Sequence, residues 1–392
     1  MNNEKIKILL IGIVAYVIST VVSYLVFSNL SSSGQSKVIT PIPETAKGKE
    51  GQTLFDDKLP KTEECPLSGA MYSKQQRSWW EKHRPLGVMI ENHLDARPQS
   101  GISSSDVVYE VVAEGGITRF LVLFYCQDAG VVGPVRSART YFLDFVSEYG
   151  DYPLYAHVGG ANTSGPADAL GQIDEYGWQS YNDMNQFSIG FPTYWRDYER
   201  LGHPVATEHT MYSTTEKLWK IGESRKLTNV DEKGKRWDEK FKKYTFKDDA
   251  VFTGRPETQT ISFGFWEGYS DYDVKWDYDK ASNSYLRTNG GAKHEDKDNS
   301  KQLSAKNVVL LFMRESRAND GYEGNLHMIY GTKGTGKATI FMDGKKVDAT
   351  WSKKDRTART VLTDVATGKE IQFNKGRIWF EILAIGNAPT VK

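Results

Sequence analysis

The sequence predicts an α+β protein in which an N-terminal transmembrane helix and a flexible tether precede a mixed α/β domain and a smaller β-rich domain. Three observations lead to this fold class. Residues 8–27 carry no charge, the segment after them is rich in Ser, Pro, Gly and Lys, and the remainder is longer than one typical domain. The predicted boundaries are an anchor at 1–30, a linker at 31–61, a first domain at 62–226, a charged connection at 227–249 and a second domain at 250–388.

The anchor is predicted from the apolar segment at residues 8–27 (ILLIGIVAYVISTVVSYLVF). A helix of this length crosses a hydrocarbon layer of ~30 Å once. Lys5 and Lys7 precede it, so we expect the N-terminus to stay inside and the folded domains to lie outside the cytoplasmic membrane. A cleaved signal peptide is the alternative, because the serines at 31–33 are small enough for a cleavage site. No cysteine lies beside the segment, which excludes a lipobox.

The first domain is predicted to mix strands and helices, and the second to consist of strands. Apolar runs at 86–91, 119–126 and 154–158 have strand composition, whereas 137–149 and 214–224 have helical spacing, the latter with Ser213 as its N-cap. In the second domain only strands are predicted, separated by turn signals. They lie at 260–266, 273–278, 285–287, 308–313, 326–330, 338–342 and 377–385.

Composition limits the class of function. Lysine plus arginine equals aspartate plus glutamate at fifty each, and this neutral balance argues against nucleic-acid binding. The run GTKGTGKA, which ends at Ala338, matches the spacing of a phosphate-binding loop. A strand follows it instead of the helix that phosphate binding requires, so no nucleotide site is predicted. No cofactor and no metal motif is recognised either, because the spacing of His203, Glu208 and His209 matches no standard zinc site.

The chain contains two cysteines, Cys65 and Cys126. Outside the cytoplasm they could form a disulfide that closes a loop of about sixty residues. In the chain-entropy model, closing such a loop stabilises the folded protein by roughly 4 kcal/mol. Two unrelated buried thiols are the alternative. We favour the disulfide.

Candidate binding residues lie in short polar loops between the apolar strands of the first domain. Arg136 and Arg139 lie three residues apart at the predicted start of a helix, where they could share a face and clamp a carboxylate or phosphate. The competing interpretation is an internal network of ion pairs with Glu91, Glu110, Glu114 and Asp144. The predicted ligand-binding set is Arg97, Arg119, Arg136, Arg139, Asn92 and Gln99.

A catalytic site is the weaker hypothesis. Glu91 or Glu114 could act as acid or base together with His157 or His209, because histidine titrates near neutral pH and burial can raise the pKa of a carboxylate. The sequence carries no G-x-S-x-G, H-E-x-x-H or S-x-x-K motif. A hydrogen-bonded structural role is the alternative for each histidine.

Several longer strings resemble the YerB-like family of bacterial proteins, which are described as lipoproteins with two domains of unknown function. The resemblance runs from Arg84 to the C-terminus and is most specific in ARPQSG and GPVRSAR. Further strings are RPLGVMIENH, YEVVAEGGITRFL, YAHVGG, WDYDKASNSYLR, AKNVVLLF and GRIWFEIL. The resemblance implies an envelope protein that contacts penicillin-binding enzymes in cell-wall synthesis, and it supplies no catalytic residues. The chain departs from the family in its anchor and in the longer, more aromatic segment 165–200.

Together these observations predict a membrane-anchored, extracytoplasmic binding or adaptor protein that holds an anionic cell-wall component or a partner's acidic surface. A hydrolase or transferase acting on cell-wall glycan or peptide, with a Glu/His pair, is the second hypothesis. The third is a structural module in which the polar loops satisfy one another. Low exposure of all four arginines would favour this third hypothesis.

Overall fold

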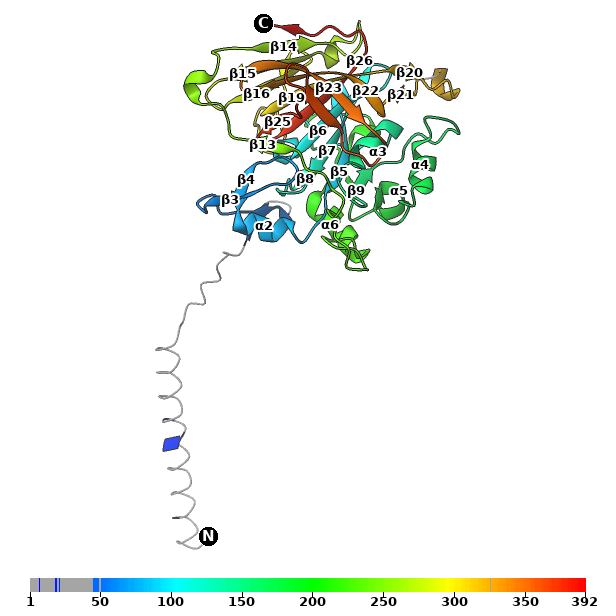
Figure 1. Ribbon diagram of the computed structural model, residues 1–392. Coiled ribbons are helices and arrows are strands. Elements are labelled where there is room, and N and C mark those ends of the chain that lie inside the picture. Colours follow the sequence, from blue (N-terminus) through cyan, green and yellow to red (C-terminus); the bar gives the residue numbers. More distant parts are fainter. Residues whose placement is uncertain (1–6, 8–17, 20, 22–44, 49–50, 325) are drawn as a thin grey trace. The chain divides into compact units, whose positions relative to one another are not determined.

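The computed structural model describes residues 7, 18–19, 21, 45–48, 51–324 and 326–392 (Figure 1). The predicted anchor at 8–27 and the first part of the linker lie almost entirely outside these residues. Among the described residues, no helix is long and apolar enough to cross a membrane. Residues 45–392 form one compact unit. Within the last part of the predicted linker, the short strand β1 (Ala46–Lys47) pairs with β2 (Thr53–Leu54).

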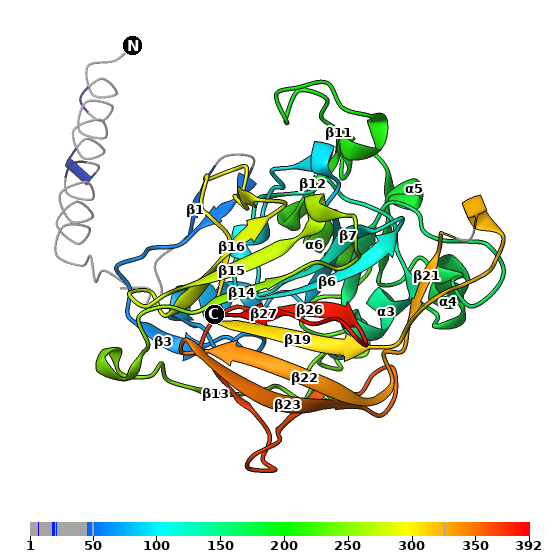
Figure 2. The same ribbon diagram turned by 90° about the horizontal axis from the view of Figure 1, so that it is seen from above.

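A mixed sheet of ten strands forms the centre of the unit. The predicted strand at 377–385 is part of its middle, because β26 pairs in parallel with β6 from the first predicted domain. Both sequence regions therefore contribute to one sheet (Figure 2). The strands, in spatial order, are β10 (Asp183–Asn185), β9 (Leu154–His157), β5 (Leu86–Glu91), β7 (Ile117–Phe124), β6 (Val107–Glu114), β26 (Ile378–Ala384), β19 (Asn307–Met313), β22 (Gly334–Met342), β23 (Lys345–Lys353) and β24 (Val361–Asp364).

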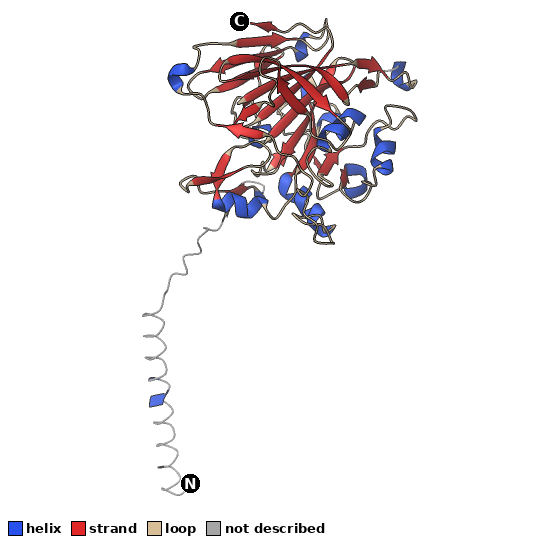
Figure 3. Ribbon diagram, in the orientation of Figure 1, coloured by secondary structure: helices blue, strands red, loops and turns tan. Residues whose placement is uncertain are grey.

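One face of this sheet is covered by helix α3 (Thr140–Val146). The ring of Tyr109 on β6 stacks on Phe145 of α3 at 4.7 Å and on Phe380 of β26 at 4.5 Å, measured between ring centroids. All seven residues of α3 are buried, so this helix is shorter and more enclosed than the predicted 137–149. The other α-helices of the compact unit, drawn in blue in Figure 3, all end before Arg225 and are α2 (Lys74–Trp80), α4 (Ala169–Glu175), α5 (Gln186–Ile189) and α6 (Thr215–Ser224).

Helix α6 begins one residue later than predicted. Thr214, not Ser213, is its N-cap, and the Thr214 hydroxyl accepts a hydrogen bond from the backbone N–H of Lys217 at 3.1 Å. Ser213 instead donates its hydroxyl to the carbonyl oxygen of Thr193. The cap satisfies one of the backbone donors that every helix N-terminus leaves unpaired.

A second, six-stranded sheet covers the opposite face of the ten-stranded sheet. Its Trp276 contacts Trp379 of β26 at 5.3 Å between ring centroids, and Trp379 in turn contacts Phe120 of β7. The protein therefore has three layers, with helix, mixed sheet and antiparallel sheet stacked in that order. The strands of the second sheet are β17 (Ala292–Lys293), β16 (Ser284–Asn289), β15 (Val274–Asp279), β14 (Thr260–Phe263) and β27 (Thr390–Val391), with β18 (Ser304–Ala305) beside β16.

Short strands complete the unit, and a disulfide links two of its segments. Cys65 and Cys126 are bonded, which confirms the predicted pairing. The bond joins the β3–β4 hairpin to the chain just after β7. The short strands are β3 (Lys61–Glu64), β4 (Met71–Ser73), β8 (Val131–Val132), β11 (Trp195–Arg196), β12 (Met211–Thr214), β13 (Thr245–Lys247), β20 (Glu315–Arg317), β21 (Met328–Tyr330) and β25 (Gln372–Asn374).

Candidate functional site

Polar side chains gather where three parallel strands of the ten-stranded sheet end. Strands β10, β9 and β5 are parallel neighbours, and Asn185, His157 and Glu91 are their last residues. The carboxyl ends of parallel strands are the usual place for ligand sites in such sheets, because the connecting loops open there. The GPVRSAR and HVGG loops meet at this edge, where the backbone N–H of Val158 donates to the carbonyl oxygen of Arg136.

Glu91 organises the site by holding two basic side chains. Its Oε1 accepts a hydrogen bond from Nε of Arg136 at 3.1 Å, and its Oε2 lies 2.8 Å from Nδ1 of His209. The carboxylate is buried, with 3% of the residue exposed. The hydrogen bond to Glu91 raises the pKa of His209, and the negative charge of Glu91 adds to the effect. The structure thus forms one of the predicted Glu/His pairs, Glu91 with His209.

Arg136 extends from this pair into a cleft of about 530 Å³. Among the described residues, neither terminal nitrogen of its guanidinium has a hydrogen-bond partner, and a quarter of the side chain is exposed. Ser137, Asn162, Phe187, Arg196 and Glu208 also line the cleft. Arg136 can therefore donate two hydrogen bonds to a bound group while Glu91 fixes its orientation.

Gly159 shapes one wall of the cleft. Its φ is +57°, which only glycine adopts without cost, and a Cβ at this position would lie 2.9 Å from the ring of Phe187. The Phe187 ring can thus lie close to the loop, although 76% of the residue is exposed. An exposed aromatic ring beside an arginine provides a flat apolar surface next to a positive charge.

Arg119 and Arg139 do not reach this cleft. Both pair with Glu114, with Arg119 Nη2 at 2.8 Å from Oε1 and Arg139 Nη2 contacting Oε2. Burial alone would raise the pKa of Glu114, but the two guanidinium charges outweigh burial and hold the pKa well below its usual range. The predicted clamp of Arg136 with Arg139 is wrong, because helix α3 begins after Arg139 and the two side chains pair with different glutamates.

Arg97, Asn92 and Gln99 contribute to the interior of the protein. Arg97 donates to the carbonyl oxygen of Asn92 at 2.9 Å and lies over the ring of Tyr272, and burial lowers the pKa of its guanidinium to about 10. The side-chain amide of Gln99 donates to the Asn92 side chain at 3.0 Å, and its Oε1 lies 2.8 Å from Nε2 of His294. These contacts join the first half of the chain to the six-stranded sheet.

His157 is fully buried with both ring nitrogens engaged. Nε2 lies 2.5 Å from the carboxylate of Asp183, and Nδ1 lies 2.6 Å from the carbonyl oxygen of Gly159. These contacts fix the HVGG loop and leave neither nitrogen free for proton transfer to a ligand. Glu114 and His157 thus have separate partners, and the structure favours Glu91 and His209 among the predicted acid–base residues.

Sequence reasoning did not single out three residues that shape this edge, namely Asp183, Phe187 and Arg196. Asp183 pairs with His157, and Arg196, which lines the cleft, donates through Nη1 to the hydroxyl of Thr210 at 3.2 Å and to the carbonyl oxygen of Thr207. The aromatic richness of segment 165–200 was the one available signal, because two of its phenylalanines are exposed, Phe187 and Phe191.

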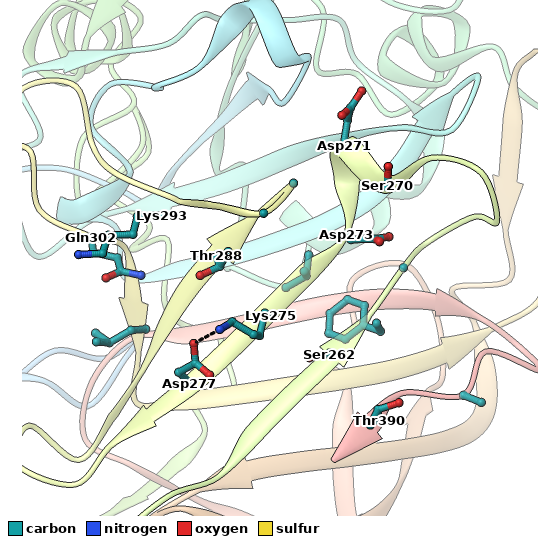
Figure 4. Close-up of a pocket in the computed structure, with 17 residues that line it drawn as sticks. Ser262, Ser270, Asp271, Asp273, Lys275, Asp277, Thr288, Lys293, Gln302 and Thr390 are labelled. Atoms are coloured by element: carbon teal, nitrogen blue, oxygen red, sulfur yellow. Dashed lines mark ion pairs between the residues drawn. The ribbon is translucent and has the colours of Figure 1, made fainter. Parts of the chain in front are cut away.

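A second groove, of about 1050 Å³, lies on the outer face of the six-stranded sheet (Figure 4). Side chains that alternate with the buried ones project into it, such as Ser262, Thr288 and the ion pair of Lys275 with Asp277 at 2.8 Å. Among the described residues, the Asp277 carboxylate also accepts a hydrogen bond from the half-buried Thr260 at 3.0 Å, and the groove is broad and open. It is larger than the Arg136 cleft, but it lacks the oriented charges that mark a binding site.

The fold and the cleft define a three-layer protein with an arginine-bearing cleft at the carboxyl ends of parallel strands. The chain belongs to the family described as "Protein of unknown function (DUF3048)", whose N-terminal domain matches residues 67–228 and whose C-terminal domain matches residues 261–380. It is 27% identical over 322 residues to "Putative lipoprotein YerB" of Bacillus subtilis (strain 168), an alignment that covers 81% of this chain and 86% of the relative. The crystal structure of the YerB protein from Bacillus subtilis has the same fold, with a TM-score of 0.67 and 23% identity over 84% of this chain and all of that one.

Proposed function

We propose that this protein is an extracytoplasmic binding protein of the bacterial cell envelope, and that the Arg136 cleft holds a carboxylate-bearing component of the cell wall. Residues 8–27 would anchor the chain as a single span in the cytoplasmic membrane, with the folded unit outside. The description of the Bacillus relative as a "Putative lipoprotein" supports this location. A lipid anchor and a helical anchor would both hold the folded unit at the outer face of the membrane.

One observation carries the proposal. Among the four predicted arginines, only Arg136 lies at a cleft with its terminal nitrogens unpaired among the described residues. Its Nε is held by Glu91, so the guanidinium is oriented before a ligand arrives and less rotamer entropy is lost on binding. An oriented guanidinium suits a planar carboxylate, which accepts two parallel hydrogen bonds.

The rest of the cleft fits the remainder of such a ligand. Arg196 adds a second positive charge, and Asn162 adds an amide that can pair with hydroxyl or peptide groups. The exposed ring of Phe187 offers a surface against which a sugar ring or an apolar side chain can pack. Cell-wall fragments carry carboxylates, sugar rings and peptide groups together.

The test is calorimetric titration of the full-length protein, purified in detergent, with soluble muropeptides. Arg136→Ala should weaken binding by roughly tenfold or more, because it removes a charge-assisted pair. Arg317→Ala, which removes an exposed arginine on β20, is the matched control and should leave affinity unchanged. Equal affinity of the protein and Arg136→Ala would refute the assignment. Binding to a purified penicillin-binding enzyme but not to muropeptides would identify a protein partner instead.

A second candidate function, hydrolysis or group transfer on the same material, is favoured by the Glu91–His209 pair. The 2.8 Å contact to Nδ1 leaves Nε2 of His209 as the nitrogen that could exchange a proton with a ligand. Incubation of sacculi with the protein, followed by mass spectrometry, tests this alternative. New fragments that disappear with His209→Ala would establish an enzyme, whereas an unchanged profile from folded protein would exclude one.

A further inference from the structure

Two histidines and an aspartate converge beside the Arg136 cleft without a role in the proposed binding. His93, Asp95 and His209 each place one potential ligand atom within 4.8 Å of the other two. His93 and Asp95 flank the start of the turn η2 (Leu94–Ala96) directly after β5, and His209 ends the turn η4 (Thr207–His209). The two segments are 116 positions apart in the sequence, so the fold brings the cluster together.

We infer that His93, Asp95 and His209 form a site for a divalent transition-metal ion, with zinc as the best match to two imidazoles and one carboxylate. Such ions prefer ligand sets of this type, and tetrahedral zinc holds nitrogen at about 2.0–2.1 Å. Ligands around it are separated by roughly 3.3 Å, so the potential ligand atoms, which lie within 4.8 Å of one another, must approach by up to about 1.5 Å. The inference goes beyond the proposed function and does not depend on it.

Glu91 provides the support that a metal-ligating histidine normally has. Its carboxylate lies 2.8 Å from Nδ1 of His209, which fixes the proton on that nitrogen and leaves the lone pair on Nε2. Nε2 has no hydrogen-bond partner among the described residues, and it is not one of their fully buried atoms, so an ion can reach it. A buried imidazole with one nitrogen held by a carboxylate and the other unpartnered matches the second-sphere pattern of metal sites.

The local charge also suits a dication. The carboxylates of Glu91, Asp95 and Glu208 lie near the histidines, and Arg136 interacts with Glu91 and Glu208. Arg196 lines the same cleft as Glu208, so three negative groups face two positive ones, and one net negative charge remains on the protein side.

The two imidazole rings are stacked, with centroids 4.6 Å apart and planes inclined by 16°. Imidazole lone pairs lie in the ring plane, so ligation by both rings requires one to turn out of the stack. His93 is the ring that can turn, because 31% of its side chain is exposed and it lies on a surface turn. Its Nδ1 accepts a hydrogen bond from the backbone N–H of Asp95 at 3.2 Å, which keeps His93 and Asp95 together and leaves Nε2 of His93 as the nitrogen for a metal ion.

The test is a calorimetric titration of the full-length, untagged protein with zinc chloride, followed by the visible absorption of the cobalt-substituted protein. We expect one ion per chain and a cobalt spectrum of tetrahedral intensity. His93→Ala and His209→Ala should each weaken zinc binding at least about tenfold, and Glu91→Gln should weaken it by roughly 10–100-fold. His203→Ala is the matched control, since His203 is an exposed histidine six positions before His209.

His93→Ala keeps the result interpretable, because its partly exposed side chain can be removed without opening the core. Circular dichroism and the denaturation midpoint verify that each variant is folded. Absence of stoichiometric zinc binding would overturn the inference. Binding that persists in both His93→Ala and His209→Ala, or that is lost in His203→Ala, would also overturn it, because the ion would then be held elsewhere.

Discussion

Glu110 and Glu381 lie directly opposite each other on the parallel strands β6 and β26, where both are fully buried and share the guanidinium of Arg287. Burial raises the pKa of Glu381 well above its usual range, and the neighbouring Glu110 carboxylate raises it further. Arg287 contacts Glu110 and lies over the rings of Phe120, Trp276 and Trp379. The pair of strands that joins the two halves of the chain therefore carries two facing carboxyl groups beside a single buried cation, and this environment favours the neutral form of Glu381.

This arrangement predicts opposite effects of two substitutions. Glu381→Gln should change the free energy of unfolding at pH 7 by less than about 1 kcal/mol, because glutamine imitates the protonated acid. Arg287→Met should destabilise the protein by about 3–5 kcal/mol, because it leaves the Glu110 charge buried without its cation. Chemical denaturation of both variants measures the difference. Equal destabilisation by the two would show that Glu381 is ionised.

The burial of His83 should lower the free energy of unfolding in mild acid. Its ring stacks on Trp219 at 4.7 Å and contacts Trp79 at 4.8 Å, and burial lowers its pKa to about 4. The unfolded chain, in which the histidine pKa is about 6.5, binds the extra proton between pH 6.5 and 4. Stability from this residue is thus complete above pH 6.5 and falls by about 3 kcal/mol as the pH drops to 4.

The control for this prediction is the variant His83→Phe, which keeps a ring between the tryptophans and cannot titrate. Asp106 titrates in the same window with the opposite sign, because burial raises its pKa to about 6 and its contribution is lost as the pH rises through that value. The informative quantity is therefore the difference between the protein and His83→Phe at pH 7 and at pH 4.5. The same pH dependence in both would contradict the prediction.

The disulfide between Cys65 and Cys126 spans 61 positions of sequence. Replacing both cysteines by serine should lower the free energy of unfolding by about 4 kcal/mol, because the unfolded chain regains the freedom of that loop. Thermal and chemical denaturation of the double variant, compared with the oxidised protein, provide the measurement. A change below about 1 kcal/mol would show that the loop is already constrained in the unfolded chain.

Substitution of Gly159 should weaken ligand binding while the protein still folds. Gly159→Ala would place a methyl group against the ring of Phe187 and force a left-handed backbone on alanine, at a cost of about 1 kcal/mol. We expect the variant to fold and to bind muropeptides more weakly, because Phe187 must move from the wall of the cleft. Alanine at Gly177 is the matched control, since its φ is also positive and its Cβ would meet nothing within 4 Å. Equal affinity of both variants would argue against a role for the Phe187 wall.

The predicted strands are present in the structure, but β6 and β23 were not predicted, and neither was the assembly of the strands. The run at 377–385 has strand composition, and its position at the end of a β-rich region suggested a separate second domain. In the structure this run is β26, and it pairs with β6. The paired residues Glu110 and Glu381 are 271 positions apart in the sequence. Parallel pairing between distant segments leaves no local signal, because each strand shows only its own burial pattern.

The residue types of the candidate site were predictable, whereas their pairing was not. Glu91, Arg136 and His209 were all identified from polar strings, but so were Arg119 and Arg139, which Glu114 holds in the interior. A one-dimensional pattern shows that charges are interspersed with apolar strands. The sequence pattern cannot show which arginine is fully paired with a carboxylate and which arginine has two guanidinium nitrogens available to a ligand.

The most direct test of the central claim is a thermodynamic cycle between Arg136 and the ligand's carboxylate. Calorimetry would compare the protein and Arg136→Ala, each with a muropeptide that has free carboxylates and with the same muropeptide after amidation. We expect amidation to weaken binding to the protein at least tenfold and to leave binding to Arg136→Ala nearly unchanged, a coupling of about 1.4 kcal/mol or more. Equal effects of amidation on both proteins would contradict the account, because Arg136 would then not contact the carboxylate.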